Sequence, residues 1–337
     1  MRRALPVIAL FLLAPLVGEV LLGATPVSRL GGLIPLSALY GGGAVLIREL
    51  ARRRGNGWGS IALLGAVYGL LEEGIGVQSV FNPTLFNAGT LGARVFGVNG
   101  VWTEWTIGYH VVWSIAIPIL LAEWLFPDRR EEPWLGVPGT SAMAVLYALG
   151  LVAVSVIFRV IVTPGFHAPL AGEVGVVIVS AVLVAAALGR SADEVQPARR
   201  NDVTVPSPWL LGLIAFLASG LWFGLLALPE GLKHGPRVLL PMSLGVAMAA
   251  ALYAGISRWS SSRAWTGIHA LSLASGAMAV SMLFGFVAVT ASNPIDHRGQ
   301  GVVMTLAVAL LLVFGRRLSM RERAARPRPA PVAVEAS

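Results

Sequence analysis

The chain has 337 residues, of which 56% are hydrophobic and only 12% are charged. Soluble domains carry about 25% charged residues, so this chain has too few charges to keep the surface of soluble domains in water. It contains no cysteine, which excludes disulfides, thiolate metal sites and cysteine nucleophiles. The composition therefore predicts a protein of the lipid bilayer, and the bilayer is its expected partner.

Apolar runs that are long enough to cross a bilayer recur along the whole chain. A spanning helix needs about 20 mostly apolar residues. Ten such runs lie between charged or Pro- and Gly-rich breaks, at residues 5–23, 31–47, 58–80, 101–125, 140–162, 168–189, 208–228, 237–256, 264–289 and 301–315. The sequence therefore predicts an all-α fold, a polytopic transmembrane helix bundle of about ten spans.

The basic residues predict how this bundle is oriented. Cytoplasmic loops retain Lys and Arg, whereas translocated loops avoid them. With the N-terminus inside, 19 of the 25 Lys and Arg fall in inner segments and five in outer segments, while Arg159 lies within the fifth run. We therefore expect both termini to be cytoplasmic, in the cell (cytoplasmic) membrane. The first run is expected to be a retained helix rather than a signal peptide, because Glu19 interrupts it.

The distribution of ionisable residues divides the chain into three parts. Residues 1–136 hold four spans and most of the ionisable residues within the membrane, and residues 137–315 hold six further spans of the same expected domain. Residues 316–337 form a basic, Pro-rich tail, which is expected to be disordered and cytoplasmic. The net charge of +8 is explained by the inner loops and by contact with anionic lipid, so no nucleic-acid partner is expected.

The third run carries two adjacent carboxylates, Glu72 and Glu73. An ionisable side chain in hydrocarbon costs on the order of 3 kcal/mol or more, so both are candidates for a functional site. At 100° per residue they flank a stripe of small residues, a surface on which another helix packs closely. This stripe consists of Ala62, Gly65, Gly69 and Gly76. Two adjacent carboxylates in a low dielectric do not both ionise, which suits a general base or a proton relay; hydrogen-bonded packing between helices is the alternative.

The fourth run adds His110 on a polar helix face that also contains Ser114. A rise of 1.5 Å per residue places Glu19 and Glu72 about 21 Å, and His110 about 16 Å, from the cytoplasmic edge of the bilayer core. We therefore predict one buried site in which Glu72, Glu73 and His110 act in acid–base chemistry or proton relay. Glu19 and Ser114 are expected nearby, as buried polar residues.

Other polar residues in the spans are assigned less specific roles. Arg159 and Glu173 fall near the outer ends of adjacent spans and are expected to pair, and Glu104 lies at the depth of an aromatic belt. His269 is a further buried polar residue with no assigned partner. No cofactor is expected. One histidine beside two carboxylates is a poor zinc site, and the sequence leaves other metals open.

Short motifs follow one another through residues 1–136, at 48–53, 57–58, 68–74, 81–83, 97–99 and 109–115. Together they resemble a group of uncharacterised actinobacterial-type multi-pass membrane proteins. This resemblance implies a location in the membrane and no particular activity.

The Glu72–Glu73 pair is followed 38 residues after Glu72 by His110. This spacing resembles part of the CAAX-prenyl-protease and bacteriocin-processing (CPBP) superfamily of intramembrane proteases, although Val77 and Thr106 stand where its motifs have Arg and Phe. The resemblance implies an intramembrane hydrolase in which a glutamate activates water and the histidine stabilises an oxyanion. The sequence thus leaves three classes open: a non-catalytic membrane subunit, a carrier with a buried Glu/His site, and this hydrolase.

Overall fold

The computed structural model describes residues 4–189 and 202–324. Its long α-helices are α1 (Leu5–Pro15), α3 (Gly42–Arg53), α4 (Trp58–Leu70), α5 (Gly100–Tyr109), α6 (Ile117–Leu125), α7 (Val137–Ile157), α8 (Leu170–Leu188), α9 (Pro208–Gly224), α11 (Leu239–Ser260), α12 (Gly267–Phe284) and α13 (Pro294–Ala324). Two short helices are α2 (Leu33–Leu36) and α10 (Glu230–Lys233). The antiparallel hairpin of β1 (Arg94–Val95) and β2 (Val98–Asn99) is the one sheet within the described ranges.

These elements join into stretches long enough to cross a membrane, and this confirms the predicted all-α polytopic bundle. Eight such stretches occur in the described part of the chain: Val27–Arg53, Gly100–Leu125, Val137–Val162, Leu170–Leu188, Pro208–Ala227, Gly235–Ser260, Gly267–Val289 and Pro294–Ala324. Two shorter or more polar stretches, Leu5–Val20 and α4 with η4 (Leu71–Gly76), correspond to the first and third predicted spans. Eight and two together match the ten predicted runs in order.

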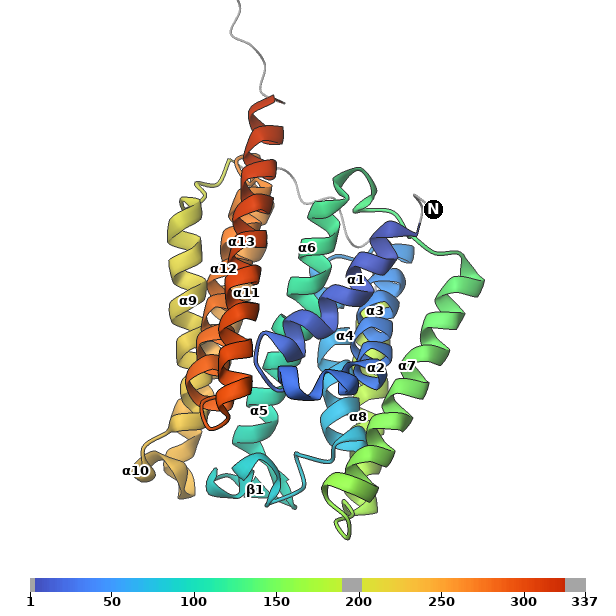
Figure 1. Cartoon of the computed structure of the whole chain (residues 1–337), viewed down its shortest axis with the longest axis vertical. Helices are drawn as coiled ribbons and strands as arrows, with labels where there is room; N and C mark the ends of the chain where they lie inside the picture. Colours follow the sequence, from blue (N-terminus) through green and yellow to red (C-terminus); the bar gives the residue numbers. More distant parts are fainter. Residues whose placement is uncertain (1–3, 190–201, 325–337) are drawn as a thin grey trace, which may run out of the picture.

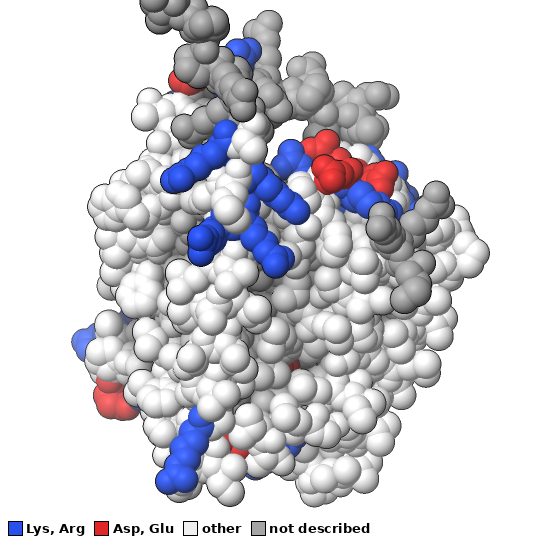
Figure 2. All heavy atoms as spheres, turned by 45° about the horizontal axis from the view of Figure 1, so that its top comes forward, with Lys and Arg blue, Asp and Glu red and all other residues white. Residues whose placement is uncertain are grey.

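The two ends of the described chain lie at the same end of the bundle, where α1 begins and α13 finishes (Figure 1). The β1 hairpin and α10 lie at the opposite end (Figure 1). Lys and Arg side chains gather on the end shared by the two termini, as Figure 2 shows. Both features agree with an even number of crossings, and the cytoplasmic position of the basic end stays a prediction.

Reporter fusions test this orientation directly. Fusions after Thr90, Gly165 and Leu232 are expected to read extracytoplasmic, because these residues lie in the connections at the end opposite the termini. Fusions after Trp134 and Arg263 are expected to read cytoplasmic. Paired alkaline phosphatase and green fluorescent protein reporters measure the two sides. A cytoplasmic signal from any of the first three positions would contradict the predicted topology.

The last helix is longer than the predicted span of residues 301–315. The Asn293 side chain accepts hydrogen bonds from the backbone N–H groups of Ile295 and Asp296, at 3.0 and 3.3 Å, and so caps α13 at its start. The helix then continues to Ala324, into the segment expected to be a disordered tail. Residues 325–337, the rest of that tail, lie outside the described residues.

The small-residue stripe of the third span packs as predicted in its central part. A Cβ atom added at Gly65 would lie 3.2 Å from the Cα of Val111, and one added at Gly69 would lie 3.1 Å from the Cβ of His110. These glycines therefore let the helix that carries His110 approach α4 closely. Gly76 faces α7 instead, at Leu151, and Ala62 is only half-buried.

Candidate functional site

Four stretches of π-helix carry His110 and the polar residues that surround it. In π geometry the backbone N–H donates to the carbonyl five positions earlier, as when the Val77 N–H donates to the Glu72 carbonyl at 2.7 Å. These turns are η1 (Leu16–Val20), η3 (Ser37–Gly41), η4 (Leu71–Gly76) and η6 (His110–Ala116). Single π turns inside α-helices occur frequently at functional sites. The described residues contain two further π turns, at Phe158–Val162 and Gly285–Val289, so four of the six lie in this region.

The His110 ring is at the centre of the group. Its Nε2 atom lies 3.0 Å from Glu73 Oε1, and its Nδ1 atom lies 3.0 Å from Ser114 Oγ. Glu72 Oε2 lies 3.4 Å from the same Nδ1 atom. All four residues are buried. The structure thus brings together the three residues predicted to share one site, with both ring nitrogens engaged.

The second oxygen of Glu73 continues the group toward the loop after η4. The Ser79 hydroxyl donates a hydrogen bond to Glu73 Oε2, and the Trp102 indole N–H donates to Ser79 Oγ at 2.8 Å. Ser79 is completely buried. Glu73 therefore accepts from a hydroxyl on one side and contacts the imidazole on the other, which fixes the orientation of its carboxylate.

Glu19 belongs to the same group but reaches it through Tyr40. The Tyr40 hydroxyl donates to Glu19 Oε1 at 2.6 Å, and the Thr25 hydroxyl donates to Glu19 Oε2 at 2.7 Å. The Tyr40 ring centroid lies 6.1 Å from that of His110. Gly18 makes this approach possible, since a Cβ atom there would lie 2.7 Å from the Tyr40 ring. Glu19 itself is half-buried, unlike the glutamates of η4.

Aromatic rings enclose the group on the side of α4 and α7. The Tyr68 ring centroid lies 5.6 Å from that of Tyr40, 5.5 Å from that of His110 and 5.8 Å from that of Tyr147. The hydroxyls of Tyr68 and Tyr147 are buried without a hydrogen-bond partner, and so is Glu72 Oε2. The sequence pattern does not predict any of the three tyrosines as a site residue. Tyr68 precedes Glu72 by one helical turn, so helical spacing could have found it.

The charges of this group are unbalanced. Glu72 and Glu73 form ion pairs with His110, and across residues 4–189 and 202–324 no ion pair joins Glu19, Glu72 or Glu73 to a Lys or Arg. Three carboxyl groups thus share one imidazole. Within the same ranges, no group of three or more His, Cys, Asp or Glu side chains is arranged to hold a metal ion. Charge balance here therefore depends on protons or on another cation.

One known protein family matches the part of the chain that contains this site. The model of an uncharacterised membrane protein family matches residues 8–326. The chain belongs to this family. No curated protein matches the chain, and no solved structure does. The family match supports the predicted membrane family, and nothing in these comparisons supports the CPBP resemblance.

One predicted ion pair outside the His110 group is present in the structure. Arg159 forms an ion pair with Glu173, with 2.6 Å between Nη2 and Oε1, and also donates to the Ile75 carbonyl at 3.3 Å. The Gln78 amide donates to the same Glu173 oxygen at 2.6 Å. Glu104 is half-buried and faces α11, where a Cβ atom added at Gly245 would lie 2.6 Å from Glu104 Oε1.

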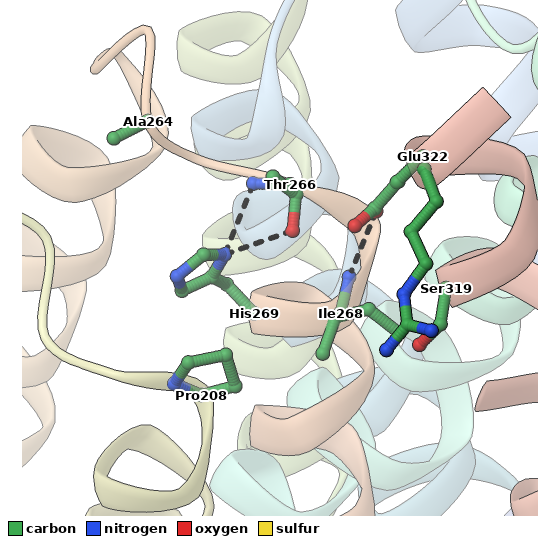
Figure 3. Close-up of a pocket in the computed structure, with 8 residues that line it drawn as sticks. Pro208, Ala264, Thr266, Ile268, His269, Ser319 and Glu322 are labelled. Carbon is green, nitrogen blue, oxygen red and sulfur yellow. Dashed lines mark hydrogen bonds between the residues drawn. The ribbon is translucent and has the colours of Figure 1, made fainter. Parts of the chain in front are cut away.

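His269 lies at the start of α12, apart from the His110 group. Its Nδ1 atom accepts a hydrogen bond from the Thr266 backbone N–H at 3.1 Å and lies 3.0 Å from the Thr266 hydroxyl (Figure 3). Its ring stacks on Trp265, with 5.5 Å between centroids. The side chain is half-buried in a pocket that Glu322 of α13 also lines. The structure thus gives His269 a capping contact rather than the buried position expected.

Arg48 departs most clearly from the expectation for inner basic residues, which was contact with lipid. It is completely buried, because α3 continues to Arg53 instead of ending near residue 47. Its guanidinium donates to Glu49 and Glu123, at 3.1 Å each, and lies 3.4 Å above the Trp134 ring. It also donates to three main-chain carbonyls, those of Arg129, Arg130 and Glu132. Arg48 thus ties α3 to α6 and to the connection that follows α6.

Proposed function

We propose that this protein is a carrier of the cell (cytoplasmic) membrane in which Glu72, Glu73 and His110 exchange protons during transport. The observation that carries the proposal is the His110 ring held between two buried carboxylates, 3.0 Å from one and 3.4 Å from the other. In a low dielectric such a group is sensitive to any change in charge or solvation. A proton can therefore move between the imidazole and a carboxylate when the substrate binds or leaves.

The unpartnered oxygens favour a carrier over a non-catalytic subunit. A polar group that serves only to pack helices is expected to have its hydrogen bonds satisfied, because an unsatisfied buried group costs about 1–3 kcal/mol. Glu72 Oε2 and the hydroxyls of Tyr68 and Tyr147 lack such partners. Three of the ten such atoms among the described residues thus come from this one group, as expected for a functional site, where stability is given up for binding.

The alternative is a CPBP-like hydrolase, in which Glu72 or Glu73 would activate water and His110 would stabilise the oxyanion. The contact between Glu73 and His110 fits that chemistry too. However, an oxyanion needs a donor that is free to point at it, and both ring nitrogens of His110 already face Glu73, Ser114 and Glu72. We therefore place the carrier first.

Proton movement into proteoliposomes tests the proposal. The full chain, reconstituted with a pH-sensitive dye inside the vesicles, is expected to move protons when gradients of Na⁺, K⁺, amino acids or sugars are applied in turn. Glu73→Gln is expected to abolish this movement, because an amide cannot take up the proton. Glu104→Gln is the matched control, since Glu104 lies in a span but outside the group, and it is expected to retain the signal.

Two outcomes would contradict the carrier. Equal proton movement in the wild type and in Glu73→Gln would show that Glu73 takes no part in transport. A wild type that moves no protons under any gradient, but cleaves a fluorogenic transmembrane peptide in a Glu73-dependent manner, would replace the carrier with the hydrolase.

A further inference from the structure

Three unpartnered oxygens of the site come from two neighbouring helical stretches. Tyr68 and Glu72 lie one turn apart on α4 and η4, and Tyr147 lies on α7. Only 1% of Tyr68 and 3% of Glu72 are exposed, and the rings of Tyr68 and Tyr147 are in contact at 5.8 Å between centroids. Both hydroxyls are within electrostatic reach of the Glu72 carboxylate. The three oxygens thus belong to neighbouring side chains, and each of them is buried without a hydrogen-bond partner.

Two glycines at the start of α3 allow the Tyr68 and Tyr147 rings to approach this helix closely. A Cβ atom added at Gly43 would lie 2.7 Å from the Tyr68 ring and 3.2 Å from the Tyr147 ring, and one at Gly42 would lie 3.1 Å from the Tyr147 backbone nitrogen. Any side chain at Gly43 would therefore displace both rings. The α3 backbone therefore lies directly against the two tyrosine rings.

The charges of the surrounding group can be balanced by protons or by a cation. Glu19, Glu72 and Glu73 carry a formal charge of −3 when ionised, and a protonated His110 offsets one charge, so that −3 + 1 leaves −2. Uncompensated charge in a low dielectric is strongly unfavourable. Tyr40 and Thr25 stabilise Glu19 with hydroxyls, which carry no charge. A cation beside Glu72 would lower this electrostatic cost and would add a partner for Glu72 Oε2, which faces His110 Nδ1 at 3.4 Å but accepts no hydrogen bond.

We propose that Glu72, Tyr68 and Tyr147 bind one small monovalent metal cation, of which Na⁺ is the probe. One carboxylate and two neutral hydroxyl oxygens are hard ligands that match a single positive charge. Ca²⁺ takes 6–8 oxygen ligands including several carboxylates, and Mg²⁺ requires near-ideal octahedral geometry, so neither suits this set. An organic ammonium is too large, because the rings of Tyr40, Tyr68 and Tyr147 already touch one another.

This cation would be the coupling ion of the proposed carrier, and only this role of the cation rests on the proposed function. Glu72 contacts both His110 and the cation, so binding of the cation favours the ionised carboxylate and release of a proton. The cation and a proton therefore compete for the same oxygen. The cation bound and the proton released balance in charge, and no redox partner is needed.

Binding of ²²Na⁺ to the purified full chain in lipid nanodiscs tests the site without any transport assay. The wild type is expected to bind ²²Na⁺ saturably, and excess unlabelled Na⁺ but not choline is expected to displace it. Glu72→Gln is expected to abolish binding, and Tyr68→Phe and Tyr147→Phe are each expected to weaken it about tenfold, as for the loss of one ligand worth about 1.4 kcal/mol. Tyr253→Phe is the matched control, because Tyr253 is 51% exposed on α11.

A second measurement protects the test against misfolding. Na⁺ is expected to raise the melting temperature of the wild type and of Tyr253→Phe, since a ligand that binds only the folded state stabilises it, but not that of the double variant Tyr68→Phe/Tyr147→Phe. Absence of saturable ²²Na⁺ binding to the wild type, or equal binding by the double variant, would overturn the inference. Proton movement driven by another solute would then still leave the carrier intact.

Discussion

Replacing Arg48 by methionine is expected to lower the free energy of unfolding of the bundle by about 3–5 kcal/mol, the usual effect of breaking a buried ion pair from one side. Methionine retains an apolar stem over Trp134 but no donor. Glu49 would lose its ion-pair partner, and the carbonyls of Arg130 and Glu132 would lose donors at 2.8 and 2.9 Å. Monodisperse yield and melting temperature in detergent measure the effect.

The planar shape of the Arg48 guanidinium, and not its charge alone, is expected to stabilise the bundle. Arg48→Lys keeps the positive charge, but an ammonium has three donors on one atom and cannot span Glu49, Glu123 and the carbonyls together. It is therefore expected to recover only part of the lost stability. Arg258→Met is the control, because Arg258 is exposed at the end of α11. Equal melting temperatures for Arg48→Met and the wild type would contradict the role of this network.

Replacing His110 by glutamine is expected to reduce proton movement by about 100-fold or more, the usual contribution of a positioned acid–base group. The glutamine amide can still donate to Glu73, so that the bundle remains folded, but it cannot exchange a proton at neutral pH. Flux must be expressed per folded molecule, from the monodisperse fraction recovered after reconstitution. This variant separates proton exchange from packing.

Ser114, which contacts the His110 ring, provides a variant with a smaller expected effect on flux. Ser114→Ala removes one hydrogen bond at Nδ1, worth about 1 kcal/mol, and is expected to lower flux only moderately because Glu72 still faces that nitrogen. His167→Gln, at an exposed histidine in the connection before α8, is expected to have no effect. If His110→Gln lost folded yield while flux per folded molecule stayed unchanged, a structural role would replace the relay.

Hydropathy along the chain predicts the class of the fold, and helical spacing predicts which residues lie at the centre of the proposed site. Apolar runs of spanning length repeat locally along the chain, so composition and hydropathy predict the helices without any knowledge of packing. Helical phase and depth placed Glu72, Glu73 and His110 at similar positions, because each quantity follows from the spacing within one helix. The contact of His110 with Glu73 at 3.0 Å agrees with that prediction.

Contacts between helices select the side chains that complete the proposed site and the charges that are buried. Tyr40, Tyr68 and Tyr147 are ordinary aromatic residues within apolar runs, and only the close approach that Gly18 and Gly43 permit makes them neighbours of the glutamates. The π turns likewise require the assembled bundle, because their wider backbone geometry is stabilised by packing rather than by local preference. Spacing along one helix contains no information on these contacts between helices.

The burial of Arg48 is a second feature that the sequence alone does not predict. By sequence it belongs with the basic residues of a cytoplasmic loop, because charge at the end of an apolar run usually marks the interface. Its complete burial depends on Glu123 and on the carbonyls of residues 129–132, more than 70 positions away in the chain. The free energy of a buried charge is set by partners that folding brings to it, so only the three-dimensional arrangement could decide that this arginine lies inside the protein.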